Sequence, residues 1–82
     1  MGLMMGSDKP FRVVVEYDYV DPSTGISSVM RTLHGPYELK HTAKSQGKRI
    51  ANSSAYWFKT GTNHRYRIEQ CDGWTELEEY YV

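Results

Sequence analysis

The sequence predicts an α+β domain in which one helix packs on one face of a mostly antiparallel four-stranded sheet, in the chain order ββαββ. Two stretches rich in β-branched and aromatic residues precede a single stretch with helical periodicity, and two further β-rich stretches follow it. The chain has 82 residues, which is enough for one core and too few for a second domain. We therefore expect a single layer of strands covered on one side.

The first two strands are expected to form a hairpin. Residues 11–20 alternate between two faces, with Phe11, Val13 and Val15 sharing one of them. Residues 21–25 (Asp-Pro-Ser-Thr-Gly) have the composition of a turn, because proline fixes φ and glycine permits a positive φ. The second strand is expected from about residue 26 to residue 33, and the His-Gly-Pro sequence at 34–36 ends it.

The helix is expected over residues 37–53. Its narrow apolar stripe, at 100° per residue, consists of Leu39, Ala43, Gly47, Ile50 and Ala51. A glycine inside a helix costs about 1 kcal/mol relative to alanine, so its presence on the apolar stripe needs a reason. We expect a close approach of the helix to the sheet at that position. Residues 52–54 (Asn-Ser-Ser) are typical of a helix exit.

A second hairpin is expected from residues 55–60 and 65–71, joined around residues 61–64. In this arrangement Tyr56 and Phe58 fill the core beneath the helix, and Trp57 points outward. The alternative places Tyr56 and Phe58 outward beside Arg65 and Arg67, as a surface on which bases could stack. The tail from 74 to 82 fits either a short fifth strand or a helical turn. Residues 1–9 are expected to form a flexible N-terminus, and residues 10–82 a single domain.

Composition excludes several classes of protein. Ten basic and ten acidic residues give a net charge of zero, which argues against a uniformly basic nucleic-acid binder. The sequence contains no apolar run long enough to span a membrane and no signal-peptide pattern. The single cysteine, Cys71, has no internal disulfide partner. We therefore expect a cytoplasmic protein that has no membrane partner and is held together by packing alone.

The charges are nevertheless segregated along the chain, with a net charge of +3 over residues 37–54 and −4 over residues 71–82. Lys40, Lys44 and Lys48 follow one edge of the predicted helical stripe. We expect these lysines to lay their stems over apolar surface and to leave the ammonium groups in water. The acidic residues of the tail are expected to form a solvated end rather than a counterweight to the helix.

No set of residues has the spacing of a catalytic or metal site. The three histidines (His34, His41 and His64) do not pair with another histidine, cysteine or acid at a recognised spacing. Cys71 lies beside Asp72 and lacks the basic surroundings that activate a thiol. We therefore expect a protein that is not an enzyme and that uses no cofactor.

One resemblance to known proteins rests on the order of these elements. Two strands ending in Leu-His-Gly-Pro at 33–36 precede a short alanine-bearing helix through Ala43 and residues 50–51, and the Arg-Tyr-Arg-Ile-Glu strand at 65–69 follows. This layout resembles small α+β accessory proteins of unknown function that are encoded by bacteriophages. The resemblance implies non-enzymatic binding inside an infected cell, for instance to a host protein that is inhibited. It carries over no functional residue.

The favoured function is that of a small protein-interaction module. Eleven aromatic residues exceed what one short helix can cover, so the sheet face away from the helix is expected to carry surplus rings that dock on a partner. The residues predicted to contact a protein partner are Tyr17, Tyr19, Trp57, Trp74, Tyr80 and Tyr81. The partner is either another protein or a second copy of the chain, paired through an edge strand or the open sheet face.

The alternative function is nucleic-acid binding through the basic helix edge together with arginines and rings of the sheet. The residues predicted to carry it are Lys40, Lys44, Lys48, Arg31, Arg65 and Arg67. The acidic tail and the balanced charge count against this alternative.

Overall fold

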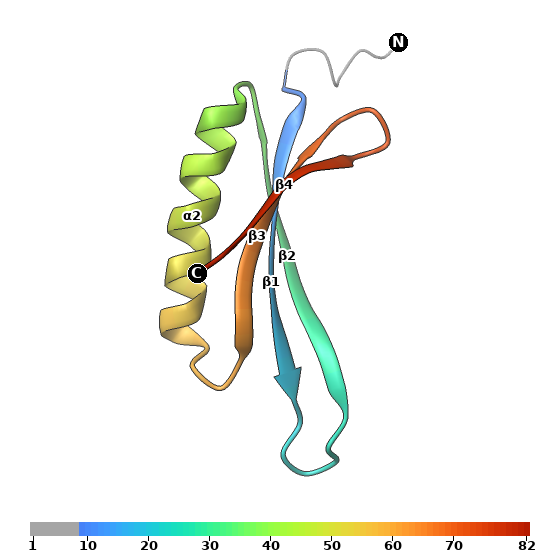
Figure 1. The fold of residues 1–82 in the computed structure, drawn as a ribbon, viewed down its shortest axis with the longest axis vertical. Helices are drawn as coiled ribbons and strands as arrows, with labels where there is room; N and C mark the ends of the chain where they lie inside the picture. Colours follow the sequence, from blue (N-terminus) through green and yellow to red (C-terminus); the bar gives the residue numbers. More distant parts are fainter. Residues whose placement is uncertain (1–8) are drawn as a thin grey trace.

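The fold, in a computed structural model that describes residues 9–82, is a four-stranded antiparallel sheet with one helix on one face (Figure 1). The elements are β1 (Phe11–Val20), β2 (Ser27–Tyr37), α2 (Lys40–Trp57), β3 (Thr62–Gln70) and β4 (Thr75–Tyr81). The strand order is β2-β1-β3-β4, which confirms the predicted ββαββ class. The flexible N-terminus predicted for residues 1–9 lies, apart from Lys9, outside the described residues.

The first hairpin forms where the sequence predicts it. Tyr17 pairs with Met30 in the ladder between β1 and β2, and the turn is closed by a bond from the Asp21 amide to the Ile26 carbonyl. The Asp21 carboxylate also accepts hydrogen bonds from the amide and hydroxyl of Ser23, which is the local turn chemistry expected of aspartate. Strand β2 continues to Tyr37, beyond the predicted end at residue 33.

The predicted strand at residues 55–60 is wrong. Helix α2 starts later than predicted and continues through Trp57, and the amide of Phe58 donates to the Ser54 carbonyl to close its last turn. Tyr56 is therefore exposed on the helix instead of lying in the core, and Phe58 is half exposed just after it. The tail supplies the missing strand as β4, which pairs with β3 along its length.

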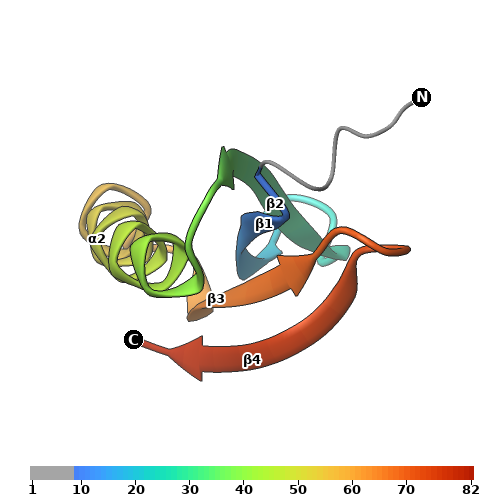
Figure 2. The same cartoon turned by 90° about the horizontal axis from the view of Figure 1, so that it is seen from above.

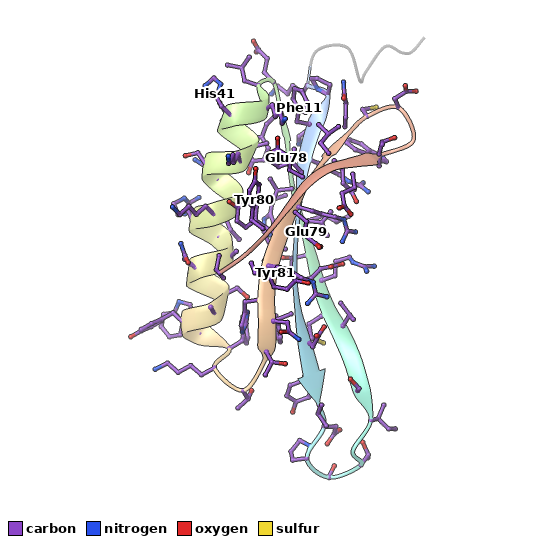
Figure 3. The ribbon with its side chains drawn as sticks, in the orientation of Figure 1. Phe11, His41, Glu78, Glu79, Tyr80 and Tyr81 are labelled. Carbon is purple, nitrogen blue, oxygen red and sulfur yellow. The ribbon has the colours of Figure 1, made fainter. Side chains whose placement is uncertain are left out.

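Strand β4 also contacts the helix through side chains. Figure 3 shows Glu78 and Tyr80 between β4 and α2, where the Glu78 carboxylate lies 2.5 Å from the Lys40 Nζ. The Lys44 Nζ lies 4.8 Å from the centre of the Tyr80 ring. The prediction that the acidic tail is a solvated end is therefore wrong for Glu78, which neutralises part of the basic helix edge.

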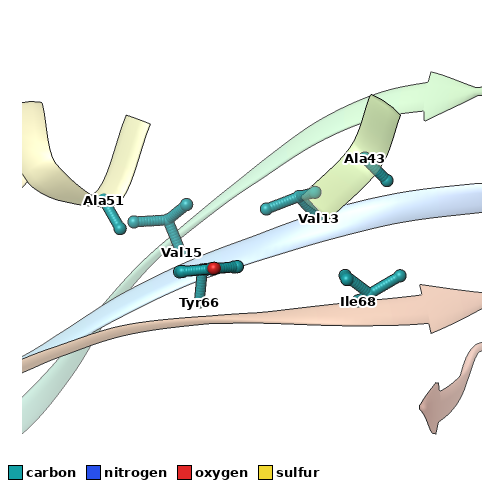
Figure 4. Close-up of a cluster of buried hydrophobic side chains, with 6 residues drawn as sticks. All are labelled: Val13, Val15, Ala43, Ala51, Tyr66 and Ile68. Atoms are coloured by element: carbon teal, nitrogen blue, oxygen red, sulfur yellow. The ribbon is translucent and has the colours of Figure 1, made fainter. Parts of the chain in front are cut away.

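The core lies between α2 and the two central strands (Figure 4). Its buried side chains are Val13, Val15, Ala43, Ala51, Tyr66 and Ile68. The helix contributes only small residues, so its backbone comes close to the sheet. A Cβ atom added at Gly47 would lie 2.7 Å from Cδ2 of Tyr66 and 3.0 Å from Cγ1 of Val13, which confirms the predicted close approach.

The opposite face of the sheet is charged, so the prediction that it carries the surplus rings is wrong. Buried Glu16 forms ion pairs there with Arg31, Arg65 and Arg67 from the strands on both sides. A second carboxylate, Glu69, pairs with Arg67 and with Arg12. The network arises because charged residues occupy the alternate positions of β1 and β3 that point away from the helix. The charged groups of this face therefore pair with one another.

Candidate protein-binding groove

Helix α2 stands over the two central strands of the sheet, β1 and β3. It contacts the edge strand β2 much less, and most residues of β2 are exposed, so the helix side of β2 is left largely uncovered. Figure 2, viewed along the long axis, shows the helix beside the sheet with β2 at the far edge from β4. The space between α2 and β2 is a groove of about 500 Å³, which is within the range of ligand-binding clefts.

The groove has an apolar lining. Its walls consist of Val15, Tyr17, Met30, Arg31, Thr32, Arg49, Ile50, Ser53, Ser54, Trp57 and Phe58. Three large apolar side chains of this set stay accessible: Trp57 is 72% exposed, Phe58 50% and Met30 45%. Exposed apolar surface gathered in a concave site marks a place where another molecule binds.

A stack of rings holds one end of the groove in place. The ring of Tyr17 lies between those of Phe58 and His64, with centroid distances of 5.4 and 4.9 Å. The His64 Nε2 lies 3.1 Å from the Phe58 carbonyl oxygen, and this contact ties the residue after the helix to β3. Gly61 makes room for the stack, because a Cβ atom there would lie 2.3 Å from Cδ2 of Tyr17. The groove is thus preformed.

The charged groups of the groove are both cationic. Arg31 pairs with Glu16 at 2.5 Å through its Nε, and 53% of its side chain is exposed. Arg49 donates to the neutral amide oxygen of Gln46 at 2.6 Å, and it has no carboxylate partner within residues 9–82. Burial works to raise the pKa of Glu16, but its bonds to Arg31 and Arg67 outweigh burial and hold that pKa below its ordinary value. The negative charge of Glu16 is therefore shared among arginines of the sheet, whereas Arg49 has no such acid beside it among the described residues.

The structure separates the residues predicted to bind a protein. Tyr17 and Trp57 line the groove together. Tyr80 packs beside Tyr66 at the edge of the core, with 5.3 Å between ring centroids. The remaining three, which lie away from the groove, are Tyr19 farther along β1, Trp74 beneath the guanidinium of Arg12, and Tyr81 beside Arg65 in the ladder.

Sequence reasoning missed Met30, Phe58 and the helix residue Ile50 as parts of the groove. Met30 pairs with Tyr17 across the predicted hairpin, so the register of that hairpin could have placed Met30 on the same face as Tyr17. Phe58 was assigned to the core side of a strand that does not form, whereas it directly follows the last turn of the helix and lines the groove.

The residues predicted to bind nucleic acid do not share a surface. Lys40 and Lys44 are engaged by Glu78 and Tyr80 on the β4 side of the helix, and Lys48 continues that helix edge. The three arginines belong to the ion-pair network on the opposite face of the sheet, so the sheet separates them from the lysines. These three are Arg31, Arg65 and Arg67.

Within residues 9–82, no group of histidine, cysteine, aspartate and glutamate side chains is arranged to hold a metal ion. His34 hydrogen-bonds through its Nε2 to the hydroxyl of Thr32 at 2.8 Å, and burial lowers the pKa of His34. His64 belongs to the ring stack, and His41 is exposed near the start of α2. In the same range, no helix combines the length and the apolar character that a membrane crossing requires.

Comparison of the chain with protein-family models, with curated proteins and with solved structures finds no match. The resemblance to bacteriophage-encoded accessory proteins therefore stays a prediction, and any assignment of function depends on the geometry of the groove.

Proposed function

We propose that this protein is a protein-interaction module whose binding surface is the groove between α2 and β2. One observation carries the proposal: an aromatic and aliphatic cleft remains open between α2 and β2, while the charged face of the sheet is closed by its own ion pairs. The free thiol of half-buried Cys71 accords with a reducing cytoplasm as the place of action.

The energetics of the groove support a protein partner. Full burial of a side chain such as methionine or phenylalanine contributes about 1.5–3 kcal/mol, so Met30 and Phe58, each about half exposed, offer about 1 kcal/mol apiece. Trp57 is larger and more exposed, and tryptophan is the residue type most enriched among those that dominate binding energy. A partner that covers all three side chains gains part of its binding energy from them, and further contacts must add the rest, because association itself costs about 4 kcal/mol or more.

The test is a selection of random displayed peptides on the immobilised protein, followed by measurement of the selected peptides on variants. Trp57→Ser and Met30→Ser each remove one exposed side chain of the groove. Tyr81→Ser is the matched control, because Tyr81 is similarly exposed but lies on the charged face. We expect the selected peptides to lose at least about fivefold in affinity on the two groove variants and to bind the control normally.

Selected peptides that bind all three variants equally would place binding elsewhere and refute the proposal. A selection that yields only sequences rich in lysine or arginine, which bind through the acidic residues of β4, would refute it as well. Circular dichroism of each variant checks that the fold is retained, so that a loss of binding is not a loss of structure.

A further inference from the structure

Strand β2 forms one wall of the groove and is also an open edge of the sheet. In an antiparallel ladder, residue pairs that exchange hydrogen bonds alternate with pairs that do not. The bond from the Asp21 amide to the Ile26 carbonyl identifies Asp21 and Ile26 as a hydrogen-bonded pair, and every second pair along β1 and β2 is then of the same kind. The main-chain groups of Met30 and Thr32 therefore point toward β1, whereas those of Val29, Arg31 and Leu33 point outward. No strand within residues 9–82 lies beside this edge.

Most of this edge, residues 27–33, lacks the devices that keep sheet edges from pairing, and the one proline of β2, Pro36, lies beyond that stretch. Between residues 27 and 33 the strand carries one charged side chain, that of Arg31, and neither lysine nor proline. The other edge, β4, carries three glutamates in seven residues. Exposed edge strands are usually kept from pairing by charged side chains, especially lysine, and by proline. Strand β2 can therefore accept an added strand over residues 27–33, whereas the glutamates of β4 disfavour this.

The charges around the edge select the strand that can be added. Such a strand lies about 4.8 Å from β2, so its side chains alternate between the helix side and the opposite side of the sheet. Arg49 lies on the helix side, and Arg31, whose side chain pairs with Glu16 and is 53% exposed, lies on the opposite side. A second copy paired edge to edge around a two-fold axis would offer these arginines no acid from its own β2, because residues 27–37 contain none.

We propose that the partner is an extended acidic segment that adds to β2 as a fifth strand. Its apolar side chains enter the groove beside Met30 and Trp57, and its carboxylates pair with Arg49 and Arg31. Hydrogen bonds between the main chain of the added strand and the outward amide and carbonyl groups of β2 supply affinity, and the two arginines supply specificity. This inference rests on the proposed function, because it names the kind of partner that the groove accepts.

The first experiment uses two synthetic peptides, acetyl-TVEETVT-amide and acetyl-TVKKTVT-amide, with amide hydrogen exchange read by NMR. In each peptide the two adjacent charged residues point to opposite sides of the strand, one toward Arg31 and one, between the two valines, toward Arg49. We expect the glutamate peptide to slow exchange at Val29, Arg31 and Leu33, because these amides gain partners. Exchange at Met30 and Thr32 stays as in the free protein, because their amides already bond to β1. The lysine peptide is expected to bind at least about fivefold more weakly.

The second experiment reverses the charge of the groove. Arg49→Glu is expected to invert the preference, so that the lysine peptide binds more tightly than the glutamate peptide. Lys48→Glu is the matched control: it makes the same charge change one residue earlier in α2, at a position that does not line the groove. An unchanged preference in Arg49→Glu, or an equal change in the control, overturns the assigned role of Arg49.

The third experiment tests strand addition itself. N-methyl groups are placed on every second amide of the glutamate peptide, in two isomers that cover alternate amides. Only one set of amides can face β2 in a given register, so one isomer is expected to bind and the other to lose at least about tenfold. Equal binding of the two isomers overturns strand addition.

The remaining outcomes separate this inference from the function beneath it. If displayed peptides bind in a groove-dependent way and the glutamate peptide does not bind, the acidic strand is overturned while the interaction module stands. If no displayed peptide depends on Trp57 or Met30, both are overturned. Protection of Val29, Arg31 and Leu33 that rises with protein concentration in the absence of peptide identifies a second copy as the occupant and also overturns the inference.

Discussion

Removal of the Glu16 carboxylate is the most direct test of the closed charged face. Glu16 is 4% exposed, and its two oxygens pair with Arg31 at 2.5 Å, Arg67 at 2.9 Å and Arg65 at 3.3 Å. The substitution Glu16→Gln keeps the volume and deletes the charge, so three guanidinium groups lose their shared partner. The side chains of Arg65 and Arg67 are mostly buried, so water cannot replace the lost carboxylate as their partner.

The expected loss in the free energy of unfolding depends on the partners that each arginine keeps after the substitution. Breaking a fully buried ion pair costs about 3–5 kcal/mol. Here Arg65 retains Asp18, Arg67 retains Glu69, and Arg31 is half exposed to water. We therefore expect a loss of about 2 kcal/mol, close to one charged hydrogen bond. A chain of this length has a total stability of about 4–12 kcal/mol, so the variant stays folded and can be measured.

The assay is urea unfolding followed by far-ultraviolet circular dichroism, and the control is Glu79→Gln. Glu79 is an exposed acid that pairs in the ladder with Arg67, and it has no ion-pair partner within residues 9–82. At pH 7 we expect the Glu16→Gln midpoint to fall by roughly 1 M and the control to change little. Equal effects in the two variants would refute the view that the network stabilises the face.

The pH dependence provides a second check. The pKa of Glu16 in the folded protein lies below its ordinary value of 4.5, so the stability that this carboxylate contributes is fully present above that value and is lost as the pH falls through the folded pKa. The stability difference between wild type and Glu16→Gln is therefore expected to stay constant from pH 7 to 5 and to shrink below pH 4.5. A difference that grows on acidification contradicts the sign of the argument.

Two further predictions concern the helix. Gly47→Ala raises helix propensity by about 1 kcal/mol, yet we expect it to lower the free energy of unfolding by about 1 kcal/mol or more, because the new Cβ would lie 2.7 Å from Tyr66; urea unfolding measures this, and Ser45→Ala on the exposed side of the helix is expected to stabilise. Lys40→Met removes the hydrogen bond that most lowers the pKa of Glu78, so an NMR titration is expected to show that pKa rising toward its ordinary value. Lys48→Met, which breaks no such bond, should leave it unchanged.

Much of the fold could be predicted because local patterns specify it. Alternation over residues 11–20, the turn at 21–25 and the small-residue stripe of the helix each determine a structure without help from distant residues. The aromatic run at residues 56–58 misled the prediction, because aromatic residues favour strands in general. In the structure Tyr56 and Trp57 continue the helix and lie on its exposed surface, where packing does not depend on their strand preference.

The charged face could have been predicted from the same alternation, and the groove could not. On β1, Arg12, Glu16 and Asp18 share a face, and β3 presents Arg65 and Arg67 to them through the ladder register. Charges of both signs on one face of neighbouring strands indicate an ion-pair network. The groove depends instead on how much of the edge strand β2 the helix leaves uncovered, and no periodicity encodes that coverage.

The position of the helix follows from small residues and from side-chain contacts. The glycine at position 47 lets the helix sit low over Val13 and Tyr66, and Lys40 and Lys44 contact Glu78 and Tyr80 of β4. The helix therefore stays over the two central strands, and the edge strand β2 is left more exposed. The wrong strand at residues 55–60 and the missed groove have one cause, because Trp57 and Phe58, assigned to that strand, belong to the end of the helix and line the groove. On our proposal, this exposed edge, with the apolar groove and Arg31 beside it, is where an acidic strand from another molecule adds.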